Sequence, residues 1–293
     1  MSGMRRWLAN PWGRPRFLAL LTVLYMVWSI APILLAVRFS FNEGRSRSTA
    51  QGWSTRWYWD EPDLSVWNDP SLRQALFQSL KLAGLAMVIA VPLGIALGLA
   101  LTRWRGRGAG LARSTTLLPL VTPELVLGVA LFLTVIHLFH FIDLGTVAQL
   151  VGHVTFSLAF VVIIVRGRLL SIGKEYEEAA MDLGASPVQA LRLALLPLLM
   201  PAVFASFMFV FAISIDDFVI SQFLSSSAST ETIPIKIYAN ARGAPTPALN
   251  ALASAMLFAT LLAVALAFLI LRVTRRSRGE RGSAMGDFAN LRV

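Results

Sequence analysis

Three acidic side chains interrupt long apolar runs of the sequence: Glu124, and the adjacent pair Asp216 and Asp217. A carboxylate is costly in hydrocarbon, so such residues are candidates for binding a charged substrate. Basic side chains in the apolar runs lie only near the ends, at Lys81 and Arg166. The pattern therefore favours a path for a cation, with a helix cap or an interhelical hydrogen bond as the alternative role of each acid. Adjacent helical residues point about 100° apart, so Asp216 and Asp217 are not expected to face one path together.

The elements that must position these acids are apolar runs, each long enough to cross a bilayer as a helix. The chain has 293 residues, of which 56% are hydrophobic and only 14% charged. Too few polar residues remain to cover a soluble core, which excludes a soluble enzyme, a nucleic-acid-binding module and a disordered protein. The sequence predicts an all-α membrane protein with six transmembrane helices: 17–38, 75–101, 115–139, 147–166, 198–224 and 249–271.

The basic residues predict the orientation of these spans. With both termini in the cytoplasm, 18 of the 26 Lys and Arg residues lie on the cytoplasmic side, as the positive-inside rule requires. The first run is longer than the apolar part of a cleavable signal peptide and is expected to remain as a span. Segments 39–74 and 225–248 would then be external. The first of them is rich in tryptophan, which favours an interfacial belt over direct ligand contact: Trp53, Trp57, Trp59 and Trp67.

The segment 173–197, between the fourth and fifth runs, has the caps of a helical hairpin. Residues Lys174 to Leu183 are typical of a short amphipathic helix with an acidic face. Gly184 suits the left-handed residue that ends a helix, Ser186 suits an N-cap, and Pro187 suits the first position of the next helix. A plain linker needs neither caps nor an acidic face. The pattern therefore favours docking of a partner protein over a hairpin packed on its own bundle.

Catalytic and metal-binding constellations are not expected in this chain. The pair Gly173-Lys174 lacks the upstream glycine and the following hydroxyl residue of a phosphate-binding loop. His137 and His140 lack a third metal ligand, and His153 is expected to make an interhelical hydrogen bond. Cysteine is absent, which excludes thiol catalysis and disulfides. The sequence predicts no enzymatic activity, no bound cofactor and no metal.

The hairpin resembles the E-A-A-x3-G-x9-I-x-L-P loop of ABC importer permease subunits. Its matching residues are Glu178-Ala179-Ala180, Gly184 and Leu196-Pro197, with Ala194 in place of the usual isoleucine. The resemblance implies the type I permease fold and a coupling helix that binds a groove of a separate ATPase subunit. Glu178 would make polar contacts in that groove, where Ala179 and Ala180 would pack closely. Gly184 would set the turn, and ATP and Mg would be bound by the ATPase partners.

Other motifs resemble the spermidine and putrescine permeases of this family, over about residues 17 to 272. They are Ser40-Phe41-Asn42, Gly52-Trp53, Arg56-Trp57-Tyr58, His153-Val154-Thr155-Phe156, Ser214 to Val219, Pro234 to Tyr238 and Asn250 to Ala253. Ala159 replaces a frequent proline, which bears on the kink of the fourth span. A polyamine would use separated carboxylates and aromatic faces, so this resemblance agrees with a path along Glu124, Asp216 and Asp217. It implies a bacterial inner-membrane location and four kinds of partner: a second related permease, two ATPase subunits, a periplasmic or lipid-anchored binding protein, and lipid.

Three alternatives remain open. A related importer permease could carry another small solute. A secondary carrier would show paired inverted repeats and would not need the 173–197 hairpin, and an intramembrane enzyme would need a nucleophile–base or metal constellation. The expected division is an N-terminus, first span and Trp-rich segment over 1–74, a five-helix permease core over 75–272, and a basic cytoplasmic tail over 273–293 that binds no nucleic acid.

Overall fold

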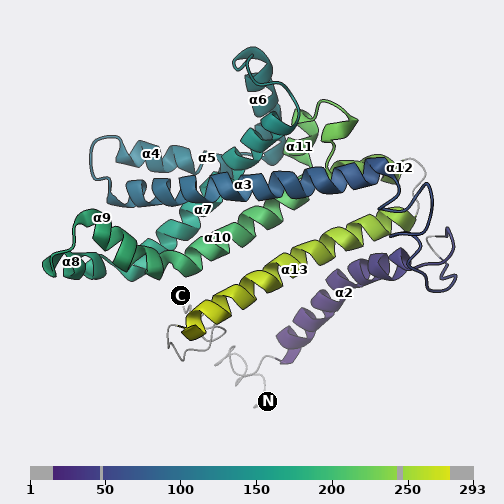
Figure 1. Ribbon diagram of the computed structural model, residues 1–293, viewed down its shortest axis with the longest axis horizontal. Coiled ribbons are helices and arrows are strands. Elements are labelled where there is room, and N and C mark those ends of the chain that lie inside the picture. Colours follow the sequence, from purple (N-terminus) through teal and green to yellow (C-terminus); the bar gives the residue numbers. More distant parts are fainter. Residues whose placement is uncertain (1–15, 47–48, 243–246, 278–293) are drawn as a thin grey trace, which may run out of the picture. The chain divides into compact units, whose positions relative to one another are not determined.

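The computed structural model describes residues 16–46, 49–242 and 247–277, and all regular secondary structure in this part of the chain is helical (Figure 1). The arginines before residue 16 and the tail beyond residue 277, both used to predict the orientation, lie outside the described residues. In chain order the elements are α2 (Arg16–Ser40), α3 (Pro70–Arg103), α4 (Ala109–Thr116), α5 (Leu118–Val121), α6 (Glu124–His137), α7 (Thr146–Ile172), α8 (Glu175–Asp182), α9 (Pro187–Gln189), the π-helix η1 (Ala190–Leu195), α10 (Leu196–Asp216), α11 (Val219–Leu224), the 3-10 helix η2 (Ala228–Thr230), α12 (Ile233–Arg242) and α13 (Pro247–Ser277).

The described residues contain five helical stretches long and apolar enough to cross a membrane, or six when one bent pair is counted as a span. They fall into two compact units. One unit is formed by residues up to 68 together with 245–254, and the other by 69–244 together with the residues from 255 onward. The all-α membrane fold is therefore confirmed, and the second unit carries most of the spans.

The second unit is built on the packing of α3, α7 and α10, which lie side by side (Figure 1). Gly94 lets α3 approach α7, because a Cβ at this position would lie 2.4 Å from Val161 Cγ1. Ala90, Val165 and Leu199 are buried in the shared core. Small residues at helix contacts are typical of membrane bundles, where close packing replaces the hydrophobic driving force. α7 continues without a break through Ala159.

The third predicted span is bent. Residues Ala109–Val121 and the helix α6 meet at an angle of 108°. Proline disfavours the helical conformation of the residue before it, and Thr122, which precedes Pro123, is extended with a ψ of 128°. The prediction of one continuous helix over 115–139 was therefore wrong at this point. The bend places Glu124 in the first turn of α6.

The fifth span begins and ends earlier than the predicted 198–224. It runs from Pro187 to Asp216, after which Asp217 is extended with a ψ of 120° and α11 begins as a separate helix. The π-helical stretch η1 lies just before Pro197. We attribute it to this proline, because proline lacks an N–H and its ring clashes with the carbonyl four residues earlier. One continuous stretch therefore connects the 173–197 hairpin to the acid pair.

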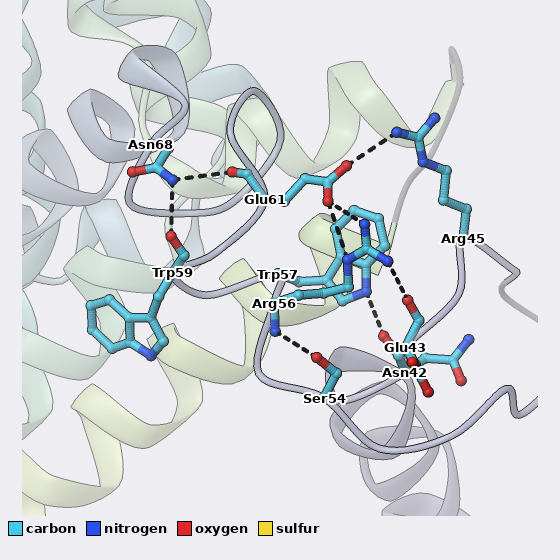
Figure 2. Close-up of polar contacts among 9 residues, drawn as sticks. All are labelled: Asn42, Glu43, Arg45, Ser54, Arg56, Trp57, Trp59, Glu61 and Asn68. Atoms are coloured by element: carbon cyan, nitrogen blue, oxygen red, sulfur yellow. Dashed lines mark hydrogen bonds and ion pairs between the residues drawn. The ribbon is translucent and has the colours of Figure 1, made fainter.

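In the first unit, the segment after α2 folds around a buried tryptophan (Figure 2). Trp57 is fully buried, and its Nε1–H donates to the Asn42 carbonyl at 2.6 Å. Glu61 pairs with Arg56 and with Arg45, and the Arg56 and Arg45 guanidinium groups hold the pKa of this carboxyl below its ordinary value. Trp57 therefore belongs to a small core and not to the predicted interfacial belt. The remaining tryptophans of the segment are exposed: Trp53, Trp59 and Trp67.

Candidate functional site

The three predicted acids come together where two helices are interrupted. Glu124 begins α6 after the 108° bend, and Asp216 and Asp217 lie at the break between α10 and α11. The helix α6 packs closely on α11, because a Cβ on Gly128 would lie only 2.9 Å from Phe223 Cδ2. This packing brings Glu124, at the start of α6, to the break between α10 and α11. The sequence placed these residues in separate spans and could not predict that they meet.

The carboxyl groups in this cluster are close enough to interact. The Glu124 carboxyl lies near those of Asp216 and Asp217, close enough for their charges to act on it. Glu124 and Asp216 are exposed, whereas Asp217 is only 7% exposed. The two adjacent aspartates therefore have different environments.

Asp217 is held by its own chain. Its Oδ2 accepts from the Ser221 backbone N–H at 2.8 Å and lies 3.2 Å from His153 Nε2. Its Oδ1 lies 3.4 Å from the Ile220 backbone nitrogen, which donates to it. These backbone donors belong to the first turn of α11, so the Asp217 side chain satisfies groups that a helix start leaves without partners.

His153, on α7, is buried and bonds to both sides of the helix break. Its Nδ1 lies 2.5 Å from Ser214 Oγ, in α10, and its Nε2 lies 2.9 Å from Ser221 Oγ, in α11. The residue is 2% exposed. The prediction that His153 makes interhelical hydrogen bonds is therefore confirmed. Its contact with Asp217 was not predicted, because sequence spacing says nothing about which faces of separate helices meet.

Next to the acids, the structure places a pair of aromatic rings and a buried amide network. Phe218 follows Asp217, and its ring centroid lies 4.8 Å from that of Tyr238, on α12. Gln78 donates to Gln149 Oε1 at 2.9 Å, and Gln149 donates in turn to the carbonyls of Ser221 and Thr230. The network ties α3 and α7 to α11 and to η2. Neither glutamine was predicted as a site residue, although each is a polar side chain within an apolar run, which is the signal that could have indicated it.

The 173–197 hairpin has the predicted local geometry. α8 covers Glu175–Asp182, and Gly184 follows it in the left-handed region with a φ of +91°. Ser186 caps the next helix, because its hydroxyl accepts from the Gln189 backbone N–H while the Gln189 side chain bonds back. Pro187 occupies the first turn. The predicted helix, sharp turn and helix are therefore confirmed, whereas their role in coupling stays a prediction.

The hairpin exposes its apolar side chains. Leu183 is 91% exposed and Val188 71%, and α8 has no buried residue. Of the predicted coupling residues, Glu178, Ala179 and Gly184 are exposed, and Ala180 and Pro197 are half-buried: these five line α8, the turn and the start of α10. Glu177 forms an ion pair with Arg103 at the end of α3. Large apolar side chains on a charged surface element indicate an interaction site.

Within the described residues, no group of three or more His, Asp or Glu side chains could hold a metal ion. His137 and His140 therefore do not gain a third ligand from elsewhere in this part of the chain.

The fold and these sites define a membrane subunit of a binding-protein-dependent importer. Residues 90–278 match the family described as the binding-protein-dependent transport system inner membrane component, and the chain belongs to this family. It is therefore an inner-membrane ABC permease subunit and not an enzyme. The predicted membrane location and the all-α permease fold are confirmed, whereas the cytoplasmic orientation of the termini stays a prediction.

Among named relatives, the chain is similar to polyamine permeases of Escherichia coli K12. It is 34% identical over 253 residues to the putrescine transport system permease protein PotI, covering 85% of this chain and 86% of that one. It is 36% identical over 251 residues to the spermidine/putrescine permease PotC, covering 86% and 91%. Among solved structures, a bacterial ABC transporter that imports alginate aligns with a TM-score of 0.68 at 15% identity, over 93% of this chain and 99% of that one. The last likeness concerns the fold alone.

Proposed function

We propose that this chain forms, with a second related permease, the membrane path of an ATP-driven importer for a polyamine such as putrescine or spermidine. The acid cluster at the helix breaks is the observation that carries the substrate proposal. Glu124 is distant in the sequence from the adjacent pair Asp216 and Asp217, and the fold brings the three together. Charged groups inside a membrane bundle are retained where they bind or move a substrate, and carboxylates bind ammonium groups.

The relatives support the same substrate class. PotI and PotC are named for putrescine and for spermidine with putrescine. A molybdenum transport permease of Mycobacterium bovis is also similar, at 34% identity, but over only 58% of this chain. A cluster of carboxylates would repel an oxyanion. The charge of the cluster therefore favours a cationic solute over an anionic one.

The hairpin is the proposed docking site for an ATPase subunit. Its exposed apolar side chains, Leu183 and Val188, flank the turn at Gly184. The helix η1 continues from the hairpin into α10, which ends at the acid cluster. Movement of an ATPase groove against α8 would therefore act, through the turn at Gly184, on the helical stretch that ends at Asp216. ATP and Mg would be held by two such ATPase partners.

The proposed topology has both termini and the hairpin in the cytoplasm, with 39–74 and 225–248 facing a periplasmic or lipid-anchored binding protein. The division into 1–74, 75–272 and 273–293 belongs to the same proposal. Because the natural chain contains no cysteine, single-cysteine variants can test the topology directly. We expect L183C to react with a membrane-impermeant maleimide only from the cytoplasmic side, and W53C only from the external side. Labelling of L183C from outside would refute the proposed orientation.

The substrate proposal is tested by uptake of labelled putrescine and spermidine into proteoliposomes that hold the complete transporter. We expect E124Q and D216N to reduce uptake at least tenfold, since each removes a charge-assisted contact. D143N is the matched control, because Asp143 is an exposed carboxylate outside the cluster. Full uptake by both E124Q and D216N would remove the cluster from the substrate path. Uptake that needs an ion gradient and no ATP would favour a secondary carrier instead.

A further inference from the structure

The contacts around Asp217 use most of the positions at which its carboxylate can accept a hydrogen bond. A carboxylate has about four acceptor positions. The Ser221 backbone N–H donates to its Oδ2 and the Ile220 backbone N–H donates to its Oδ1. His153 Nε2 lies 3.2 Å from the same Oδ2. With a side chain only 4% exposed, Asp217 presents its carboxylate to its own chain and leaves almost no surface for a substrate.

His153 is the residue that makes this arrangement possible. It comes from a third helix, α7, and joins Ser214 before the break to Ser221 after it, while the same Nε2 faces Asp217. Both serines are buried. His153 therefore fixes the angle of the break and the direction of the Asp217 carboxylate together.

We propose that His153 is a positioning residue that holds Asp217 in the scaffold, so that the substrate site offers two carboxylates, Glu124 and Asp216, and is matched to a diamine. This inference rests on the proposed function and assigns different roles within the acid cluster. Glu124 and Asp216 are exposed and come from different helices. Two carboxylates from different helices can each bind one ammonium group of a diamine, and the third ammonium of a triamine finds no partner among them.

The proposal predicts a change in selectivity when His153 is replaced. Asparagine reaches about as far as Nδ1, so H153N can still contact Ser214 but leaves Asp217 without its partner from α7. The released carboxylate then becomes a third acceptor for a triamine. One additional charge-assisted hydrogen bond should raise the affinity for spermidine relative to putrescine by about tenfold. A residue with a merely structural role would weaken binding of both polyamines alike.

The experiment is equilibrium binding of labelled putrescine and of labelled spermidine to the purified transporter, without the binding protein. We expect the spermidine-to-putrescine affinity ratio to rise about tenfold in H153N and to return to the parental value in H153N/D217N. H153Q is the matched control, because its longer side chain carries an amide donor to the position of Nε2. It should keep the parental ratio.

An unchanged spermidine-to-putrescine affinity ratio in H153N overturns the inference. The inference is also overturned if D217N keeps the parental melting temperature but loses as much polyamine affinity as E124Q and D216N lose. Should H153N fail to assemble, H153Q still decides: a spermidine-to-putrescine ratio altered in H153Q contradicts the proposed role of His153. If E124Q and D216N bind both polyamines as the parent does, the proposed function itself fails. The two failures are therefore distinguishable.

Discussion

The close approach of α7 to α11 gives the sharpest structural prediction. A Cβ on Gly152 would lie 2.5 Å from Ile220 Cγ2 and 2.8 Å from Leu224 Cδ1, where ordinary contacts begin at 3.4 Å. In G152A the two helices must therefore separate by up to 0.9 Å at Ile220. A shift of that size at the next residue, Ser221, would lengthen its 2.9 Å bond to His153 Nε2 beyond hydrogen-bond range. Overpacking of this kind costs about 1–3 kcal/mol, to which the lost buried hydrogen bond adds.

The assay is the melting temperature of the purified permease complex, together with putrescine uptake per assembled transporter. G152A should lower both. G167A is the matched control, because Gly167 lies in the same helix and a Cβ there would meet no atom within 4 Å. It should leave uptake unchanged and stabilise the helix by about 0.5–1 kcal/mol. Parental stability and uptake in G152A would show that the α7–α11 contact does not hold the site.

Three further predictions concern other parts of the chain. R103E places a second carboxylate opposite Glu177 and should reduce transport per ATP hydrolysed. The loss of stability should be small, since ion pairs at the surface contribute about 0–1 kcal/mol. R103E/E177R reverses the pair and should restore transport, and failure of this double variant would remove the pair from coupling. L183D should weaken ATPase binding about tenfold by co-purification, and full retention would argue against this docking face. Arg56 and Arg45 lower the pKa of Glu61. The ionised Glu61 carboxylate therefore stabilises the 41–68 segment at a pH above the ordinary carboxyl pKa, and this stabilisation is lost as the pH falls through the lowered pKa. Proteolysis of the segment should increase in that pH range, and E61Q should show no such increase.

Local signals in the sequence predicted the hairpin well. Gly184, Ser186 and Pro187 act on their own neighbours, through a left-handed backbone, an N-cap and a fixed φ, so their effects follow from residue type and spacing. The apolar runs predicted the number of spans for a similar reason. The length of a run and the thickness of a bilayer decide whether it can cross.

The features that were missed depend on contacts between distant residues. Pro123 could have indicated the 108° bend, but prolines also occur in unbroken helices here, as Pro92 and Pro201 do. The burial of Trp57 depends on Asn42 and its neighbours folding back over the indole. The meeting of Glu124 with Asp217 depends on how α6 packs against α11. None of these can be derived from hydropathy or helical periodicity.

The most direct test of the account is ATP-driven accumulation of labelled putrescine in proteoliposomes that contain this chain, its second permease and its ATPases, supplied with the binding protein. The account predicts accumulation that requires ATP and the binding protein and that is lost in E124Q/D216N, whose assembly is intact. Undiminished accumulation by that variant, or accumulation without ATP, would contradict it.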